Sequence, residues 1–229
     1  MWDFSQYGSQ IALISDLGEG VSYDELQKDC EKIGSVIEKR TLIFCLCENK
    51  VGSVTGYAAF MNHQIVPVLL NAHLEDGLLT NLLETYKPEY LWVPKEQTEK
   101  FPSMEKVLDI RDYSLLKTNF GTVHNLYSEL ALLLTTSGST GSPKFVRQSF
   151  ANIKANTESI IEYLNLDSSE KAITTLPMNY TYGLSIINTH LMVGATLLLT
   201  DKGLMQKEFW EFFREEGATS FGGVPYTYE

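Results

Sequence analysis

The stretch LLLTTSGSTGSPKFV at residues 132–146 holds the densest set of groups in the chain that could bind an anion. Its glycines leave backbone N–H groups open to a ligand, because they carry no side chain. Its hydroxyl side chains add donors, and its lysine adds a compact, mobile positive charge suited to a phosphate. We therefore predict a phosphate-binding loop whose contacting residues are Thr135, Thr136, Ser137, Gly138, Ser139, Thr140, Gly141 and Lys144.

The same composition is also typical of a plain Gly/Ser turn in a hairpin, which would bind nothing. An apolar strand leading directly into the loop, and more hydroxyls than a turn needs, favour the phosphate site. Other motifs do not fit. A Walker A loop needs Ser or Thr after its lysine, but Lys144 precedes Phe145. A GxGxxG fingerprint is missing from this stretch, and Ser137 stands where a GxSxG elbow needs glycine.

The elements before the loop alternate between helices and apolar strands. Ser22 and Glu25 have capping-box spacing, which predicts a helix start at Ser22. Pro67 suggests that its strand lies near an edge or a bend. Residues 94–127 show no sustained period, so we expect them to connect two lobes. Helices are predicted over 22–39, 51–61 and 74–86, and strands over 41–47, 65–70 and 90–93.

The loop itself is expected between two strands of a hairpin, 129–135 and 145–147. Ser149 can cap the next helix, whose face at 153, 157, 160 and 164 we interpret as packing. Strands at 171–176, 196–200 and 219–221 and helices at 185–193 and 206–216 follow. Such alternation predicts an α/β fold with mainly parallel sheets flanked by helices. We expect two lobes, 1–115 and 116–229, the second carrying the loop and incomplete at its C-terminus.

The composition is that of an ordinary globular chain. With 18 basic and 29 acidic residues the net charge is −11, which argues against nucleic acid and anionic lipid as partners. We read Cys30, Cys45 and Cys47 as reduced and buried. No apolar run reaches the roughly 18 residues of a membrane span, and no signal peptide is apparent, so a cytoplasmic protein is expected. The histidines are scattered without metal-ligand spacing: His63, His73, His124 and His190.

The loop closely resembles the phosphate-binding signature of the adenylate-forming superfamily, which includes acyl-CoA synthetases, luciferases and peptide-synthetase adenylation domains. Thr136–Gly141 matches the TSGSTG of that signature residue for residue, and Pro143 and Lys144 follow in place. Phe145 departs from it, since the family usually has glycine there. Weaker matches occur in family order, at Ser22–Leu26, Val66–Val68, Lys87–Tyr90 and Pro177–Leu184.

This resemblance implies the N-terminal part of the large adenylate-forming domain. It implies ATP with Mg²⁺, a small carboxylate substrate activated as acyl-adenylate, and a thiol acceptor, either CoA or the phosphopantetheine arm of a carrier protein. It also places Tyr180, Tyr182 and Gly183 in the acyl-substrate pocket, with Tyr180 at the usual histidine position. Taken without the family, two tyrosines at a strand end are more often packing.

The family motifs for the magnesium-ligating glutamate, the ribose-binding aspartate and the adenylating lysine are absent from the sequence. We therefore expect a piece of a longer enzyme that is inactive alone, with no metal ligand and no catalytic residue assigned. Two alternatives stay open: a non-catalytic nucleotide- or acyl-binding module, and a structural α/β domain whose loop binds nothing.

Overall fold

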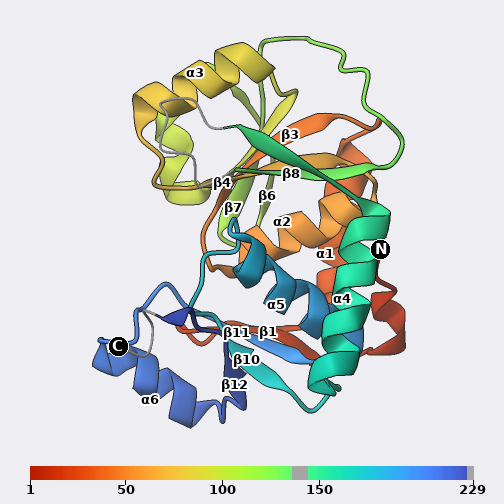
Figure 1. The fold of residues 1–229 in the computed structure, drawn as a ribbon. Helices are drawn as coiled ribbons and strands as arrows, with labels where there is room; N and C mark the ends of the chain where they lie inside the picture. Colours follow the sequence, from red (N-terminus) through yellow and green to blue (C-terminus); the bar gives the residue numbers. More distant parts are fainter. Residues whose placement is uncertain (136–143, 226–229) are drawn as a thin grey trace.

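The computed structural model describes residues 1–135 and 144–225, which form two β-sheets with helices between and outside them (Figure 1). The seven-stranded sheet has the order β6-β7-β5-β3-β4-β8-β9: β3 (Leu42–Cys47), β4 (Val66–Asn71), β5 (Tyr90–Pro94), β6 (Glu105–Ile110), β7 (Tyr113–Lys117), β8 (Leu130–Thr135) and β9 (Phe145–Ser149). The five-stranded sheet has the order β12-β10-β11-β1-β2: β1 (Ile11–Ser15), β2 (Gly20–Ser22), β10 (Lys171–Ile173), β11 (Thr196–Leu199) and β12 (Ser220–Phe221). Pairing is parallel through the middle of both sheets, which confirms the predicted fold class.

The helices form layers around these sheets. Buried side chains of α1 (Tyr23–Val36), α2 (Val51–Asn62) and α5 (Thr181–Val193) join the inner faces of both sheets in one large core. The outer faces are covered by α3 (Asp76–Tyr86) and α6 (Lys207–Glu215), and α4 (Phe150–Leu164) runs along one side (Figure 1). Two short 3-10 helices are η1 (Phe4–Gln6) and η2 (Lys95–Lys100). The three cysteines are buried free thiols, as predicted.

Several helix ends follow directly from the sequence. The capping box at α1 is confirmed: Ser22 Oγ accepts from the Glu25 N–H at 3.3 Å, and Glu25 Oε2 accepts from the Ser22 N–H at 2.9 Å. Ser149 caps α4 in the same way with Asn152. Gly194 ends α5 in the left-handed conformation, with φ of +75°. Local signals therefore fix where these helices begin and end.

Two local predictions are wrong. Residues 94–127 were expected to connect two lobes, but β6 and β7 form an antiparallel hairpin that extends the seven-stranded sheet. Its register shifts between Lys106 and Leu108, which breaks the alternation that would have marked a strand. Pro67 does not mark an edge, because β4 lies between β3 and β8. Its ladder to β8 covers only Val68 and Leu69, so Pro67 pairs with β3 alone.

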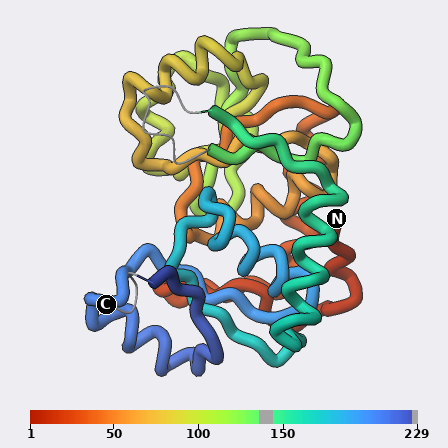
Figure 2. The backbone as a smooth tube through the Cα atoms, in the orientation of Figure 1, coloured from red at the N-terminus to blue at the C-terminus, as the bar shows by residue number. Residues whose placement is uncertain are grey.

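Each sheet contains strands from distant parts of the chain. The N-terminal strands β1 and β2 join the sheet of β10 to β12, whereas β8 and β9 complete the sheet begun by β3 to β7 (Figure 2). Sheet membership therefore does not follow the order of the chain. The division into two lobes, 1–115 and 116–229, stays a prediction.

Candidate functional site

The predicted phosphate loop is carried by the β8–β9 hairpin. Thr135 is the last residue of β8 and pairs with Phe145, and Lys144 is exposed just before β9. Since β3, β4 and β8 are parallel, the loop leaves the same sheet edge as the carboxyl ends of β3 and β4. The remaining predicted contacts lie outside the described residues: Thr136, Ser137, Gly138, Ser139, Thr140 and Gly141.

Phe145, which replaces the glycine usual in the family, fits its surroundings. Its ring lies edge-on to Tyr86 of α3, with centroids 4.9 Å apart, and packs against the outer core of the seven-stranded sheet. The antiparallel pairing of β8 with β9 runs from Leu130 opposite Ser149 to Thr135 opposite Phe145, with one register shift between Leu130 and Leu132. The side chain therefore points away from α5 and leaves the hairpin intact.

The segment predicted to form the substrate pocket begins α5. Tyr180 is the N-cap residue, its N–H donates to the Pro177 carbonyl at 3.0 Å, and its side chain is 49% exposed. Gly183 is buried, and a Cβ there would lie 2.3 Å from the Pro177 carbonyl oxygen. Glycine is thus required at 183 by close backbone packing, whatever the ligand. Tyr182 is 42% exposed and turns toward a cavity.

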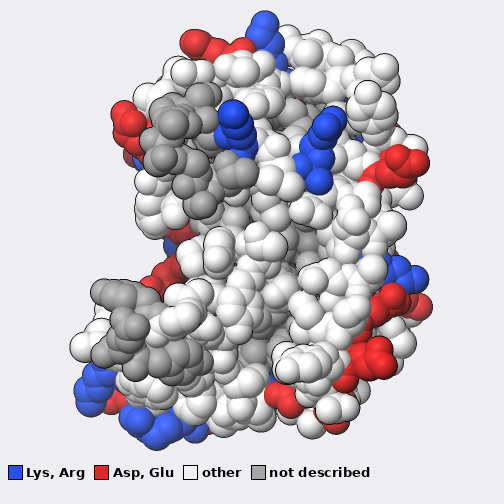
Figure 3. Space-filling view, in the orientation of Figure 1, with Lys and Arg blue, Asp and Glu red and all other residues white. Residues whose placement is uncertain are grey.

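That cavity, which we call the apolar cavity, has a volume of about 330 Å³ and lies between α4, α5 and β12. Its wall includes Leu164, which is 54% exposed although we expected it to pack. The central part of this face carries few charged side chains (Figure 3). Other lining residues are Ile160, Tyr182, Ile186, Phe221 and Gly222. An acyl chain or a ring is the kind of group that such a wall accepts.

A second cavity, of about 460 Å³, lies between the start of α5 and the β8–β9 hairpin. Leu134, directly before the loop, lines it together with Thr181 and Leu184 of α5. Ser185 lines both this cavity and the apolar cavity, so the two adjoin. The structure thus brings the base of the predicted phosphate loop close to the predicted substrate segment, although they are far apart in sequence.

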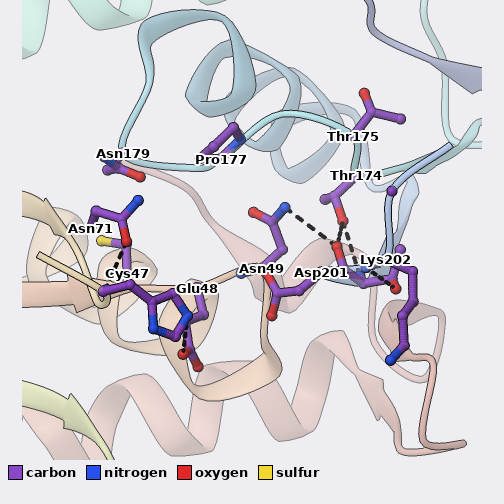
Figure 4. A pocket seen from close by; sticks show the side chains of 13 residues that line it. Cys47, Glu48, Asn49, Asn71, Thr174, Thr175, Pro177, Asn179, Asp201 and Lys202 are labelled. Carbon is purple, nitrogen blue, oxygen red and sulfur yellow. Dashed lines mark hydrogen bonds and ion pairs between the residues drawn. The ribbon is translucent and has the colours of Figure 1, made fainter. Parts of the chain in front are cut away.

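A polar cleft of about 290 Å³ lies where the carboxyl ends of β3, β4, β10 and β11 meet (Figure 4). Glu48 is buried, forms an ion pair with Lys50 at 2.7 Å, and lies 3.3 Å from His73 Nε2. Burial opposes the charge of Lys50, but the carboxylates of Glu48 and Glu96 outweigh it and raise the pKa of Lys50. Sequence reasoning missed these residues, although polar side chains directly after a buried strand were a usable signal.

Asn49 ties the two sheets together at this cleft. Its backbone N–H donates to Asp201 Oδ1 at 3.0 Å, and its side-chain amide donates to the Leu176 and Thr200 carbonyls at 3.3 and 3.4 Å. The buried Oδ1 of Asn49 has no hydrogen-bond partner within the described part of the chain. Asn49 is therefore a structural link between β3 and the five-stranded sheet.

The described residues contain neither a cluster of metal ligands nor a membrane-spanning helix. Within 1–135 and 144–225, no three His, Cys, Asp or Glu side chains lie together as a metal site. We therefore assign no residue to magnesium. In the same ranges, no helix has the length and apolar content needed to cross a membrane.

Comparison with known proteins gives independent evidence about the family of this chain. The sequence model of the family described as AMP-binding enzyme matches residues 2–229. The 2-succinylbenzoate–CoA ligase of Staphylococcus aureus (strain Newman) is 30% identical over 251 residues, covering 97% of this chain and 51% of that protein. Its counterpart from Enterococcus faecalis is 26% identical over 143 residues, covering 62% of this chain and 28% of that protein. The chain thus spans about half, or less, of the length of these relatives.

Solved structures share the fold. O-succinylbenzoate coenzyme A synthetase from Bacillus subtilis, in complex with ATP and magnesium, gives a TM-score of 0.75 at 19% identity, covering 100% of this chain and 65% of that one. ATP-bound MatB from Rhodopseudomonas palustris gives 0.78 at 20% identity, covering 98% of this chain and 49% of that one. The fold is therefore shared with these proteins.

Proposed function

Because this chain belongs to the AMP-binding enzyme family, a family of adenylate-forming ligases, we propose that it is part of an enzyme that activates a carboxylate with ATP. The product of that step is an acyl-adenylate, and a thiol then takes the acyl group. The thiol belongs to CoA or to a phosphopantetheine arm; relatives named as CoA ligases favour CoA. In this proposal, residues 1–229 would contribute ligand contacts, and the catalytic groups would belong to another part of the enzyme.

One observation carries the proposal: the base of the loop and the start of α5 line one cavity, and the apolar cavity adjoins it at Ser185. A phosphate group on the loop and an apolar carboxylic acid beside Tyr182 would therefore be neighbours. Reaction between the two requires such closeness. A chain that bound nucleotide alone would not need the second cavity.

The residues are assigned as follows. The loop from Thr135 to Gly141 and Lys144 would hold the phosphates of ATP, and its N–H groups, hydroxyls and ammonium group would stabilise the negative charge on the leaving pyrophosphate. Tyr182 would form the wall of the substrate pocket, and Tyr180 its exposed rim. Gly183 would shape the turn that positions both tyrosines. No residue of this chain is assigned as the catalytic lysine.

Nucleotide binding tests the loop. We expect residues 1–229 to bind ATP or inorganic pyrophosphate, and Lys144→Ala to weaken that binding about tenfold, as loss of a charge-assisted hydrogen bond would. Isothermal titration calorimetry measures both. Lys154→Ala is the matched control, because Lys154 is an exposed lysine on α4 away from the loop. Equal affinities in the two variants would show that Lys144 does not contact the phosphates.

ATP–pyrophosphate exchange tests the second part of the proposal. We expect no exchange by residues 1–229 with a panel of carboxylic acids. Exchange is expected once the chain is extended by the part that its relatives possess. Turnover by residues 1–229 alone would contradict the claim that catalytic groups lie elsewhere.

A further inference from the structure

The apolar cavity contains one buried polar group that the proposed function does not use. His190 lies on α5 two turns beyond Tyr182, is only 4% exposed and lines the cavity. Its Nδ1 lies 2.8 Å from the Ile186 carbonyl oxygen. A carbonyl can only accept, so the proton is on Nδ1 and Nε2 carries a free lone pair.

Nε2 has no hydrogen-bond partner within residues 1–135 and 144–225. Burial lowers the pKa of His190 below its ordinary value, so the ring is neutral near pH 7 and Nε2 remains an acceptor. A buried acceptor without a donor is uncommon in native structures and calls for an explanation. A group that enters the cavity can supply the donor.

Three other hydroxyl groups of the wall, those of Ser185, Thr189 and Ser220, already donate elsewhere. Ser185 Oγ donates to the Tyr182 carbonyl at 2.7 Å, and Thr189 Oγ1 donates to the Ile186 carbonyl at 2.9 Å. The remaining wall is largely apolar, formed by side chains such as Ile160, Leu166 and Ala172. A ligand inside would therefore meet apolar surface, the exposed side chains of Tyr163 and Tyr182, and one buried acceptor that lacks a partner within the described residues.

We propose that His190 Nε2 selects carboxylic acids whose tail carries a hydroxyl or an N–H donor. This inference rests on the proposed function, in which the apolar cavity holds the carbon skeleton of the substrate. Eight residues of helix separate Tyr182 from His190, which corresponds to about 12 Å. The donor is thus expected toward the far end of a medium-length tail, and a simple alkyl tail would leave Nε2 unpaired.

Two acids of equal length test the inference: 10-hydroxydecanoate and decanoate. We expect the protein to bind the hydroxy acid about tenfold more tightly, because only its hydroxyl can pair with Nε2. His190→Phe keeps a ring but removes the acceptor, so it should reverse the preference. His190→Gln places an amide oxygen near the position of Nε2 and should keep part of it.

Calorimetry gives the affinities, and the ¹⁵N shift of Nε2 reports its hydrogen bond in the unaltered protein. The ¹⁵N shift of Nε2 should change when the hydroxy acid is added and should not change when decanoate is added. A purely structural role of His190 would not produce this difference. It also keeps the test decisive if His190→Phe fails to fold. If the ratio of the two affinities is the same in the unaltered protein and in both His190 variants, the role of His190 is wrong and the proposed function stands. If neither acid binds, the cavity is not the substrate pocket, and both proposals about it fail.

Discussion

The indole of Trp92 packs directly against two glycines of α2. Its Nε1–H donates to the Gly52 carbonyl at 2.9 Å, and a Cβ on Gly56 would lie 2.2 Å from the same nitrogen. Trp92 is fully buried on β5, which lies between β7 and β3 in the seven-stranded sheet. The absence of side chains at Gly52 and Gly56 therefore sets how closely α2 approaches that sheet.

Gly56→Ala is expected to destabilise the fold by about 1–3 kcal/mol through overpacking, although alanine is the better helix former by about 1 kcal/mol. Urea denaturation measures the change. Gly34→Ala in α1 is the matched control: its Cβ would meet the His63 ring at 2.4 Å, but that ring is exposed and can turn aside. If both variants unfold at the same urea concentration, close packing at Trp92 is not the reason for Gly56.

Single residues were predictable where the signal is local. The Ser22 and Ser149 caps and the Gly194 helix end all depend on neighbours within a few positions. His190 was not singled out, because its position in an apolar helix reveals burial but not which ring nitrogen lacks a partner. The role of the loop residues 136–141 stays a prediction, since they lie outside the described part of the chain.

Helix α2 receives its N-terminal cap from another element. The N-cap residue Lys50 makes no side-chain cap, and the Gly52 N–H instead donates at 2.6 Å to Asp112 Oδ1 in the β6–β7 turn. Burial raises the pKa of Asp112 above its ordinary value of 3.8, and the hydrogen bond from Gly52 opposes that shift. The hairpin thus supports a helix that begins about sixty residues earlier in the chain.

Asp112→Ala should cost about 1 kcal/mol of stability by removing this cap, and Asp112→Asn should keep the acceptor without the charge. A raised pKa means that the folded state favours the protonated carboxyl. The stability that Asp112 contributes is therefore full below pH 3.8 and is lost as pH rises through its folded pKa.

Urea denaturation of the unaltered protein and of Asp112→Asn between about pH 3 and 6 isolates this effect. The advantage of the unaltered protein over Asp112→Asn should shrink as pH rises. A difference that does not change with pH would contradict the raised pKa.

Elements with strong periodicity were predictable, and those held by pairing alone were not. The fully buried run Leu42–Cys47 and the apolar stripe of α1 are obvious in the sequence. The hairpin β6–β7 was not predicted because half of the residues of β6 are charged, the strand is largely exposed or half-buried, and its register is irregular. The segment is a strand because it pairs with β7, which lies between β6 and β5.

At the scale of the whole molecule, Arg111 joins parts of both sheets. It occupies the β6–β7 turn in the left-handed conformation, with φ of +52°. Its guanidinium donates to Asp29 of α1 at 2.7 Å and to Glu19, beside β2, at 3.1 Å. Burial opposes the charge of Arg111, but these carboxylates raise its pKa. The β6–β7 turn of the seven-stranded sheet is thereby bound to α1 and to Glu19, which lies beside β2 of the five-stranded sheet.

Arg111→Ala is expected to destabilise the protein by about 1–3 kcal/mol, because the buried Asp29 would keep only its contact with the exposed Lys32. Lys32→Ala should cost less than about 1 kcal/mol, since an exposed lysine forms a weak pair. Thermal and urea unfolding give both values. A similar small loss in the two variants would mean that Asp29 does not depend on Arg111.

The exchange of strands between the sheets could not have been predicted from periodicity. The apolar pattern predicts a strand at β11, but β1 was not predicted, and the parallel pairing between the two depends on the assembled layers. The same reasoning that separated 1–115 from 116–229 assigned neighbours in sequence to one lobe. Only the three-dimensional structure reveals that the first strands complete the last sheet.

That exchange sets an order of events during translation. Thr196 of β11 hydrogen-bonds to Ile11 of β1 across a separation of 185 residues. At about 5–20 residues per second, the ribosome needs roughly 10–40 s to synthesise the partner after β1 has emerged. In that interval the seven-stranded sheet can already assemble, whereas Ile11–Ser15 can pair only with β2, and its edge toward β11 stays open. A chaperone that binds nascent chains would therefore meet the open edge of Ile11–Ser15 before β11 has been synthesised.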